Sequence, residues 1–278
     1  MRKQILLLIP FVVMFSFSNC ENEDLDPQEQ TNNVNNKQNS SDEPQKEDQE
    51  NTKNKETDNG TNPKNTNNEK NVSGNINGYS YVDLGLKSGL MWATVNIGST
   101  KAEYLGSYFS WGETKPKERY STLDAKWMIS TGSNAYYSPT YSKYVYSDGL
   151  KTLLIEDDAA SVNWGSPWRI PTSKEQKELV EACDWIWVEN YNGTGVNGAY
   201  GTSKNNANTI FFPAAGRRYD SACNFVGDIG QYWSASVYST QDAYYLTIGK
   251  YDVNANTVNN TLPRHMGMTI RAVSDNIN

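Results

Sequence analysis

The chain opens with an apolar run, continues through a long polar segment and then changes to an alternating pattern. Residues 5–15 are mostly apolar, a run shorter than the roughly 20 residues that a membrane-spanning helix needs. From residue 18 to 78 there is no Phe, Tyr or Trp, and all 8 Trp and all 18 Tyr lie beyond that segment. The pattern predicts a signal peptide over 1–19, a disordered polar tether over 20–74 and one folded domain over 75–278.

Alternation of apolar and polar positions predicts that the domain is rich in strands. Residues 79–86 and 89–98 read as a hairpin joined by a Lys-Ser-Gly turn. Further strands are predicted at 105–114, 209–215, 231–237, 243–252 and 265–275. Residues 115–150 show little periodicity, and we expect mostly loop there.

Two short helices are predicted in the middle of the domain. Residues 155–164 carry acidic side chains in their first turn, where the helix dipole favours negative charge. Thr172 with Glu175 three residues on makes a capping box. The inward stripe that follows is Gln176, Leu179, Val180 and Cys183. Strands surrounding two helices indicate an α+β domain.

Cys20 ends the apolar start and is followed directly by Glu21-Asn22-Glu23-Asp24. This arrangement resembles the lipobox of bacterial lipoproteins, in which the signal is removed just before an acylated cysteine. The acidic residues resemble the export signal of Bacteroidetes lipoproteins carried to the outer face of the outer membrane. The resemblance implies lipidation of Cys20, attachment to the membrane through acyl chains and exposure at the cell surface. The alternative is an ordinary signal peptide with an incidental cysteine.

Charge adds little about the ligand of the domain. Residues 21–77 hold 13 acidic and 6 basic side chains, so the acidity of the chain belongs mainly to the tether. No basic patch argues for nucleic acid, and we expect no nucleic-acid partner.

Several blocks of sequence carry a family resemblance. They are YVDLGLKSGLMWATVNIG, YFSWGETKPK, EDDAASVNWGSPWRIPT, IFFPAAGRR, GQYWSAS and GMTIRAV, in order over 79–273. They resemble the Fibrobacter succinogenes major paralogous domain. WRIPTSKE, a late YWSAS and the terminal IRAV also resemble the C-type lectin-like superfold, which includes the formylglycine-generating enzymes.

The resemblance implies mixed or antiparallel sheets, two flanking helices and a long polar loop over 188–230. It also implies that the first and last strands pair, 79–86 with 266–273. Ligand binding is expected on the long loop, where flat polar rings can stack on sugars or proteins. The ligand-binding candidates are Tyr191, Tyr200, Arg217, Arg218, Tyr219 and Tyr232. The large tryptophans are expected in the core.

The triplets that bind calcium in lectin-like domains are missing. Asp220, Asn224 and Asp228 could supply oxygens to Ca²⁺, but their spacing matches no calcium loop, so we expect solvated turns and no cofactor. Cys183 and Cys223 could form a disulfide outside the cytoplasm or remain two buried thiols.

These residues favour a binding protein over an enzyme. His265 is the only histidine, which argues against a hydrolase triad or a zinc site. The leading hypothesis is a surface-anchored, non-enzymatic lipoprotein whose domain binds a glycan or a protein of a host or neighbouring cell. One alternative is an enzyme of the formylglycine-generating type or a glycan-processing enzyme. The other is a structural component of a surface assembly that joins through edge strands.

Overall fold

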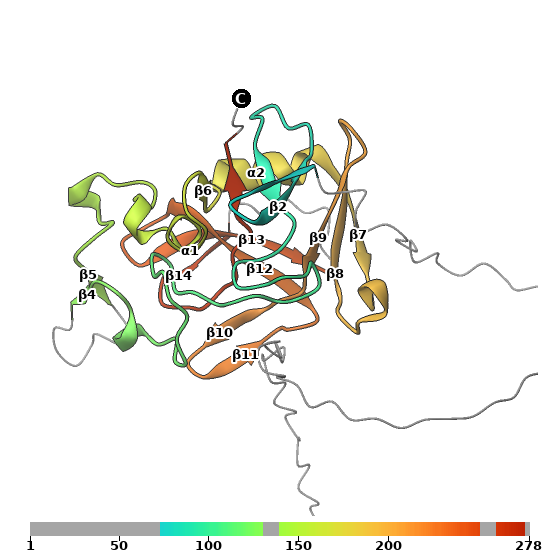
Figure 1. Ribbon diagram of the computed structural model, residues 1–278. Coiled ribbons are helices and arrows are strands. Elements are labelled where there is room, and N and C mark those ends of the chain that lie inside the picture. Colours follow the sequence, from blue (N-terminus) through green and yellow to red (C-terminus); the bar gives the residue numbers. More distant parts are fainter. Residues whose placement is uncertain (1–72, 130–138, 251–259, 276–278) are drawn as a thin grey trace, which may run out of the picture. The chain divides into compact units, whose positions relative to one another are not determined.

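The computed structural model describes residues 73–129, 139–250 and 260–275 (Figure 1). The signal peptide predicted at 1–19, the lipidation site Cys20 and almost all of the tether predicted at 20–74 lie outside these residues. The described part is an α+β fold, with mostly antiparallel sheets and two α-helices. None of its helices combines the length and the apolar character that crossing a membrane would require.

A five-stranded sheet joins the beginning and the end of the described chain. Its order is β1 (Gly74–Ile76), β2 (Tyr79–Asp83), β3 (Met91–Ala93), β15 (Val273–Ser274) and β6 (Trp168–Arg169). The predicted hairpin is confirmed, with Val82 of β2 opposite Trp92 of β3. Val273 also lies opposite Trp92, on the other side of β3.

The expected pairing of 79–86 with 266–273 is therefore wrong in its partner. β15 pairs with β3, because β2 already has β1 on one edge and β3 on the other. The contact continues as backbone hydrogen bonds, from Ala93 N to Ala272 O at 2.9 Å and from Ile97 N to Ile270 O at 3.0 Å. The first and last strands share a sheet without being neighbours.

Both predicted helices are present. The first is divided into a 3₁₀ turn η3 (Ile155–Asp157) and α1 (Ala159–Trp164). The division falls at Asp158, whose side chain caps α1 by accepting a hydrogen bond from Ser161 N at 2.9 Å.

The second helix is α2 (Ser173–Ala182), and its capping box is formed as predicted. Thr172 N donates to Glu175 Oε2 at 2.7 Å, and Glu175 N donates to Thr172 Oγ1 at 3.3 Å. Cys183 does not belong to the helix. It is the C-cap of α2 and the first residue of a strand.

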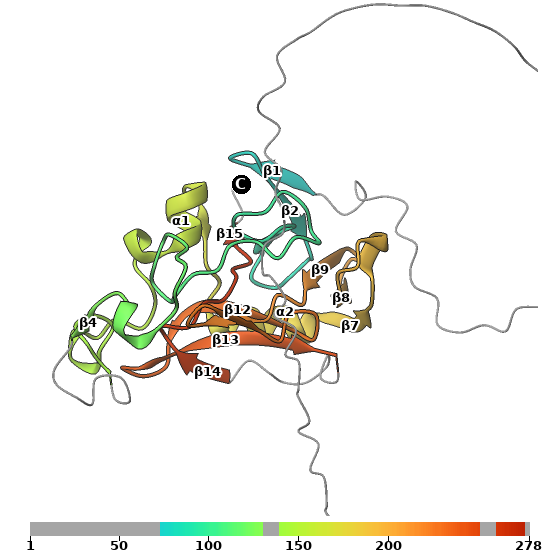
Figure 2. The same ribbon diagram turned by 90° about the horizontal axis from the view of Figure 1, so that it is seen from below.

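The helix α2 packs on a three-stranded sheet made of β12 (Ile229–Val237), β13 (Asp242–Gly249) and β14 (Asn260–Pro263). Figures 1 and 2 show α2 lying along β12 and β13. Gln176 fixes the contact, because its Nε2 donates to the carbonyls of Tyr232 and Trp233. The strands predicted at 231–237 and 243–252 are confirmed with small shifts of their ends.

Two predicted strands are mostly irregular. In the stretch 105–114, Phe109 forms an isolated bridge with Met268 and no strand develops. Of 265–275, only β15 is a strand. Both segments run through the core, where Phe109, Trp111, Met268 and Ile270 belong to one buried cluster. The predicted loop 115–150 holds only short elements: η1 (Thr122–Asp124), β4 (Met128–Ile129), β5 (Thr140–Tyr141) and η2 (Tyr146–Asp148).

The expectation of a long polar loop over 188–230 is wrong, because strands occupy much of this range. Its first part belongs to a three-stranded meander of β7 (Cys183–Val188), β8 (Gly198–Ser203) and β9 (Thr209–Pro213), with η4 (Tyr191–Gly193) between β7 and β8. Its second part is a hairpin of β10 (Arg217–Tyr219) and β11 (Ala222–Asn224).

Two glycines of this stretch, Gly198 and Gly201, are sites of close packing within β8. A Cβ atom added at Gly201 would lie 2.7 Å from the ring of Trp185, and one at Gly198 would lie 2.2 Å from the carbonyl oxygen of Phe212. Glycine in a strand interior often marks such a close approach. These two positions of the meander therefore need glycine for packing rather than for a turn.

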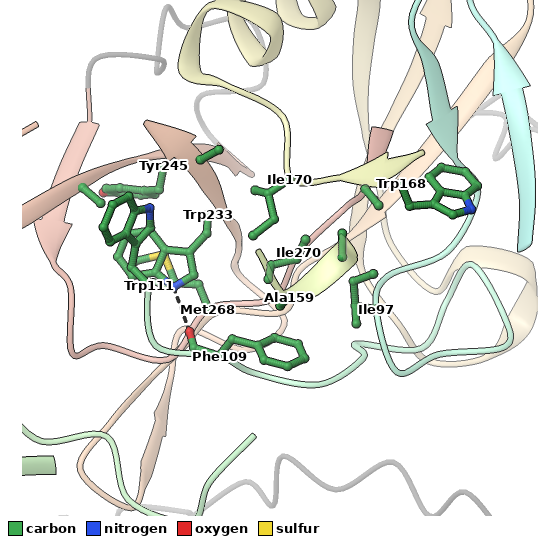
Figure 3. Packing of buried hydrophobic residues seen from close by; sticks show 14 of the residues in the cluster. Ile97, Phe109, Trp111, Ala159, Trp168, Ile170, Trp233, Tyr245, Met268 and Ile270 are labelled. Atoms are coloured by element: carbon green, nitrogen blue, oxygen red, sulfur yellow. Dashed lines mark hydrogen bonds between the residues drawn. The ribbon is translucent and has the colours of Figure 1, made fainter. Parts of the chain in front are cut away.

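Buried side chains form three clusters in the described part of the chain, of which the smallest is Val188, Tyr191 and Phe211. Figure 3 shows part of the first, where Trp233 Nε1 donates to Phe109 O at 2.8 Å beside Trp111 and Met268. The second lies between α2, the meander and β12–β13, and it includes Leu179. Of the tryptophans expected in the core, Trp164, Trp168, Trp185 and Trp233 are buried and Trp187 is half-buried.

Candidate functional site

Two of the tyrosines expected to bind ligand belong to the core, so that expectation is wrong for them. Tyr191 is buried and stacks on Phe211, with ring centroids 3.7 Å apart and planes 5° apart. Tyr232 is buried in β12, and its hydroxyl donates to Pro213 O at 2.5 Å. Tyr200 is half-buried in β8, and its hydroxyl donates to Thr209 Oγ1 at 2.9 Å.

The remaining ligand-binding candidates come together on β10. This strand pairs with β11 so that Arg217 lies opposite Asn224 and Tyr219 lies opposite Ala222. In Figure 1 the hairpin stands at the end of the domain away from α2. Tyr219 is 38% exposed and Phe225, just after β11, is 47% exposed. The hairpin thus presents aromatic surface to solvent.

Arg218 fastens this hairpin to the domain. Its backbone exchanges hydrogen bonds with Gly267, at 2.7 and 2.9 Å. Its guanidinium lies 5.3 Å from the ring centroid of Tyr120 and donates to the carbonyls of Glu118 and Ser221. Tyr120 in turn exchanges backbone hydrogen bonds with Asp220. Arg218 is therefore engaged within the protein, and its role in ligand binding stays a prediction.

An exposed ion pair stands beside Tyr219. Arg119 Nε lies 2.5 Å from Asp220 Oδ1, and both side chains are largely exposed. Sequence reasoning missed Arg119, because 101 residues separate it from Asp220 and no local motif marks it. We call the following set the hairpin surface: Arg119, Leu123, Arg217, Tyr219, Asp220 and Phe225.

A shallow cavity of about 380 Å³ opens next to the hairpin surface. Its lining is Glu113, Thr114, Lys115, Leu123, Asp124, Ala125 and Lys126. Most of its charges are already engaged. Glu113 Oε1 accepts from Lys117 Nζ at 2.8 Å, and Lys126 Nζ donates to Asp157 Oδ1 at 2.7 Å. The cavity offers polar backbone and aliphatic surface more than free charge.

His265 lies behind Tyr219, with their ring centroids 6.0 Å apart. It is 6% exposed, and within the described part of the chain its Nε2 has no hydrogen-bond partner. Burial, assisted by the nearby charge of Lys117, lowers the pKa of His265 to about 4. The imidazole is therefore neutral at neutral pH and is shielded from solvent by the hairpin.

The three candidate calcium ligands have other surroundings. Asp220 is paired with Arg119, Asn224 lies in the β10–β11 ladder, and Asp228 is exposed beyond β11. Over residues 73–129, 139–250 and 260–275, no group of three or more His, Cys, Asp or Glu side chains is placed to hold a metal ion.

Of the two alternatives for Cys183 and Cys223, the disulfide between them is not formed, because Cys183 is a free, buried thiol. Cys183 packs in the core cluster beside α2, whereas Cys223 lies opposite Arg218 in the hairpin. Burial raises the pKa of Cys183 to about 12, with Lys204 opposing the shift. Since the thiolate is the reactive form of cysteine, Cys183 is unsuited to act as a nucleophile at neutral pH.

The arrangement can hold a ligand by stacking and by hydrogen bonds. Tyr219 supplies a flat ring, and the Arg119–Asp220 pair supplies donors and acceptors beside it. Comparison of the chain with family models, curated protein sequences and solved structures finds no match.

Proposed function

We propose that the domain is a non-enzymatic binding module that takes a glycan on the hairpin surface. The single observation that carries this proposal is the exposed ring of Tyr219 next to the exposed Arg119–Asp220 ion pair. An aromatic ring covers the apolar face of a sugar, while a guanidinium and a carboxylate can bond its hydroxyl groups. A glycan therefore satisfies both parts of the surface at once.

The resemblance to lectin-like domains gives the proposal its frame. We propose a C-type lectin-like fold of the Fibrobacter succinogenes major paralogous type. The five-stranded sheet that unites β1–β3 with β15 and the presence of two helices support this assignment. The ligand surface then lies on the β10–β11 hairpin instead of on a long loop.

The cellular setting belongs to the same proposal. Acyl chains on Cys20 would anchor the chain in the outer membrane, and the polar tether over 20–74 would carry the domain beyond the lipid headgroups. Replacing Cys20 by Ser should abolish labelling of the chain by radioactive palmitate and should release it from the membrane fraction. Undiminished membrane attachment of Cys20→Ser would refute the anchor.

Binding can be tested with a glycan array and a panel of surface proteins, with and without Ca²⁺. We expect the purified full chain to bind a subset of glycans and the variant Tyr219→Ala to lose at least about tenfold in affinity, because stacking on an aromatic side chain is lost. Tyr238→Ala is the matched control, since Tyr238 is 58% exposed and follows β12. Binding to proteins alone, or an equal loss in both variants, would overturn the glycan assignment.

A further inference from the structure

The two neighbouring arginines of β10 differ in how their charges are satisfied. Arg218 donates to two carbonyls and stacks on Tyr120. The side chain of Arg217 makes no hydrogen bond and no ion pair within the part of the chain that the structure describes. Among the described residues its guanidinium contacts the ring of Phe225, whose centroid lies 5.0 Å from Arg217 Cζ. One of the two guanidinium groups is thus left open for a partner.

Arg217 is also partly removed from water. The side chain is half-buried, and its Nε is inaccessible to solvent and has no partner among the described residues. A buried donor without a partner is costly, and native proteins leave few of them. The two Nη atoms also have no partner among the described residues and are not buried, so they are the donors that a ligand can reach.

A polar residue of β12 also lies near Arg217. A parallel bridge joins Gly216 and Gly230, the residues that precede Arg217 and Gln231. Gln231 is 3% exposed, and within residues 73–129, 139–250 and 260–275 its Oε1 has no partner. Burial raises the pKa of Tyr245, and the positive charge of Arg217 opposes that rise. A second unpaired polar atom therefore accompanies the open guanidinium.

The chemistry of the guanidinium selects its partner. Arginine presents a planar fork of N–H donors that matches a carboxylate with two parallel hydrogen bonds. Arg217 and Tyr219 are two residues apart on β10, so their side chains leave the strand on the same face. A sugar that lies on Tyr219 can therefore extend a substituent toward Arg217.

We propose that Arg217 binds the carboxylate of an acidic sugar, so that the hairpin surface selects glycans that contain uronic acid. This inference rests on the proposed glycan-binding function and names the substrate class of the same surface. Tyr219 supports the sugar, the Arg119–Asp220 pair contacts hydroxyl groups, and Arg217 reads the negative charge.

The test compares polygalacturonate with the same polymer after chemical reduction of its carboxyl groups, using the full chain and biolayer interferometry. We expect the wild type to bind the acidic polymer at least about tenfold more tightly, because a charged hydrogen-bonded pair contributes on that scale. The variant Arg217→Gln should lose this preference, so that its affinities for the acidic and the reduced polymer become equal. Arg217→Lys should retain part of it, since it keeps the charge but loses the planar fork.

Lys174→Gln is the matched control, because it removes one exposed positive charge from α2. We expect it to bind both polymers as the wild type does, and thermal unfolding curves will show that all variants are folded. Equal affinity of the wild type for the two polymers, or an unchanged preference in Arg217→Gln, would overturn the role of Arg217. A parallel measurement with dextran sulfate tests whether the surface prefers sulfate groups to carboxylate groups. Tighter binding of dextran sulfate than of polygalacturonate would also refute the proposal.

The outcomes separate this inference from the function on which it rests. Binding of neutral glycans that depends on Tyr219 but shows no preference for acidic polymers would refute only the inference. Absence of binding to any glycan, acidic or neutral, would refute the proposed function and the inference together.

Discussion

The carboxylate of Asp157 lies 2.7 Å from the ammonium of Lys126, which is 31 residues earlier in the chain. The same carboxylate accepts hydrogen bonds from Lys143 Nζ at 2.5 Å and from the Tyr144 hydroxyl at 2.7 Å. The Asp157 side chain is only 4% exposed. Three separate segments therefore meet at one buried charge, beside the ring of Trp127 that both lysines approach.

Replacing Asp157 by Asn should destabilise the domain by about 2–4 kcal/mol, because the two lysines would lose the buried carboxylate that they share. Equilibrium unfolding in urea measures the change. Glu156→Gln is the control, since Glu156 is largely exposed and lies 3.4 Å from Lys143. It should cost less than about 1 kcal/mol. Equal losses in the two variants would show that the buried network contributes nothing specific.

The same network around Asp157 predicts that the stability of the domain falls at low pH. Burial acts to raise the pKa of Asp157, but hydrogen bonds from Lys126, Lys143 and Tyr144 outweigh it and hold the pKa below its ordinary value. The unfolded chain then takes up a proton before the folded one does, so this contribution is present at neutral pH and is lost as the pH falls below about 4. Unfolding curves of Asp157→Asn should show a shallower loss in that range than the wild type, and parallel curves would contradict the assignment.

The burial of His265 predicts a second loss of stability, which begins at a higher pH than that of Asp157. Its pKa is about 4 in the folded protein, below the ordinary value of 6.5. Between these values the unfolded chain binds a proton that the folded chain excludes, so stability should fall as the pH drops from 6.5 toward 4. Because the chain has one histidine, its imidazole signals in NMR spectra report the titration directly. A midpoint near 6.5 in the folded protein would refute the burial of this side chain.

Cys183 should be inert in the folded protein. Its thiol is buried and its pKa is raised to about 12, so little thiolate exists at neutral pH. Iodoacetamide should leave Cys183 unlabelled over hours in native buffer and should label it within minutes in denaturant, as read by peptide mass spectrometry. Rapid labelling of the native protein would reopen the thiol-enzyme hypothesis.

Sequence patterns predicted those elements whose signals are local. The helix α2 follows from Thr172 and Glu175, which lie three residues apart and satisfy each other's backbone. The β2–β3 hairpin follows from alternation around a short turn. The meander β7–β9 was missed because glycines such as Gly198 and Gly201 locally favour a turn. In the structure their small size instead allows close contacts with Phe212 and Trp185.

The candidate site was predicted only in part for the same reason. Residue type pointed to Arg217 and Tyr219, yet it also pointed to Tyr191 and Tyr232, which pack in the core. Burial depends on which strands meet, and a single sequence does not state that. Arg119 had no local signal, because its partner Asp220 is brought to it by the bridge between distant segments.

The position of β15 between β3 and β6 has a consequence for biosynthesis. A nascent chain that has emerged only as far as β14 exposes the facing edges of β3 and β6, with nothing yet made to fill the gap. Open strand edges are sites of intermolecular pairing, so a stalled or prematurely terminated product is prone to aggregation. Until Val273 and Ser274 have been synthesised, the chain cannot complete its five-stranded sheet and remains a substrate for chaperones and proteases.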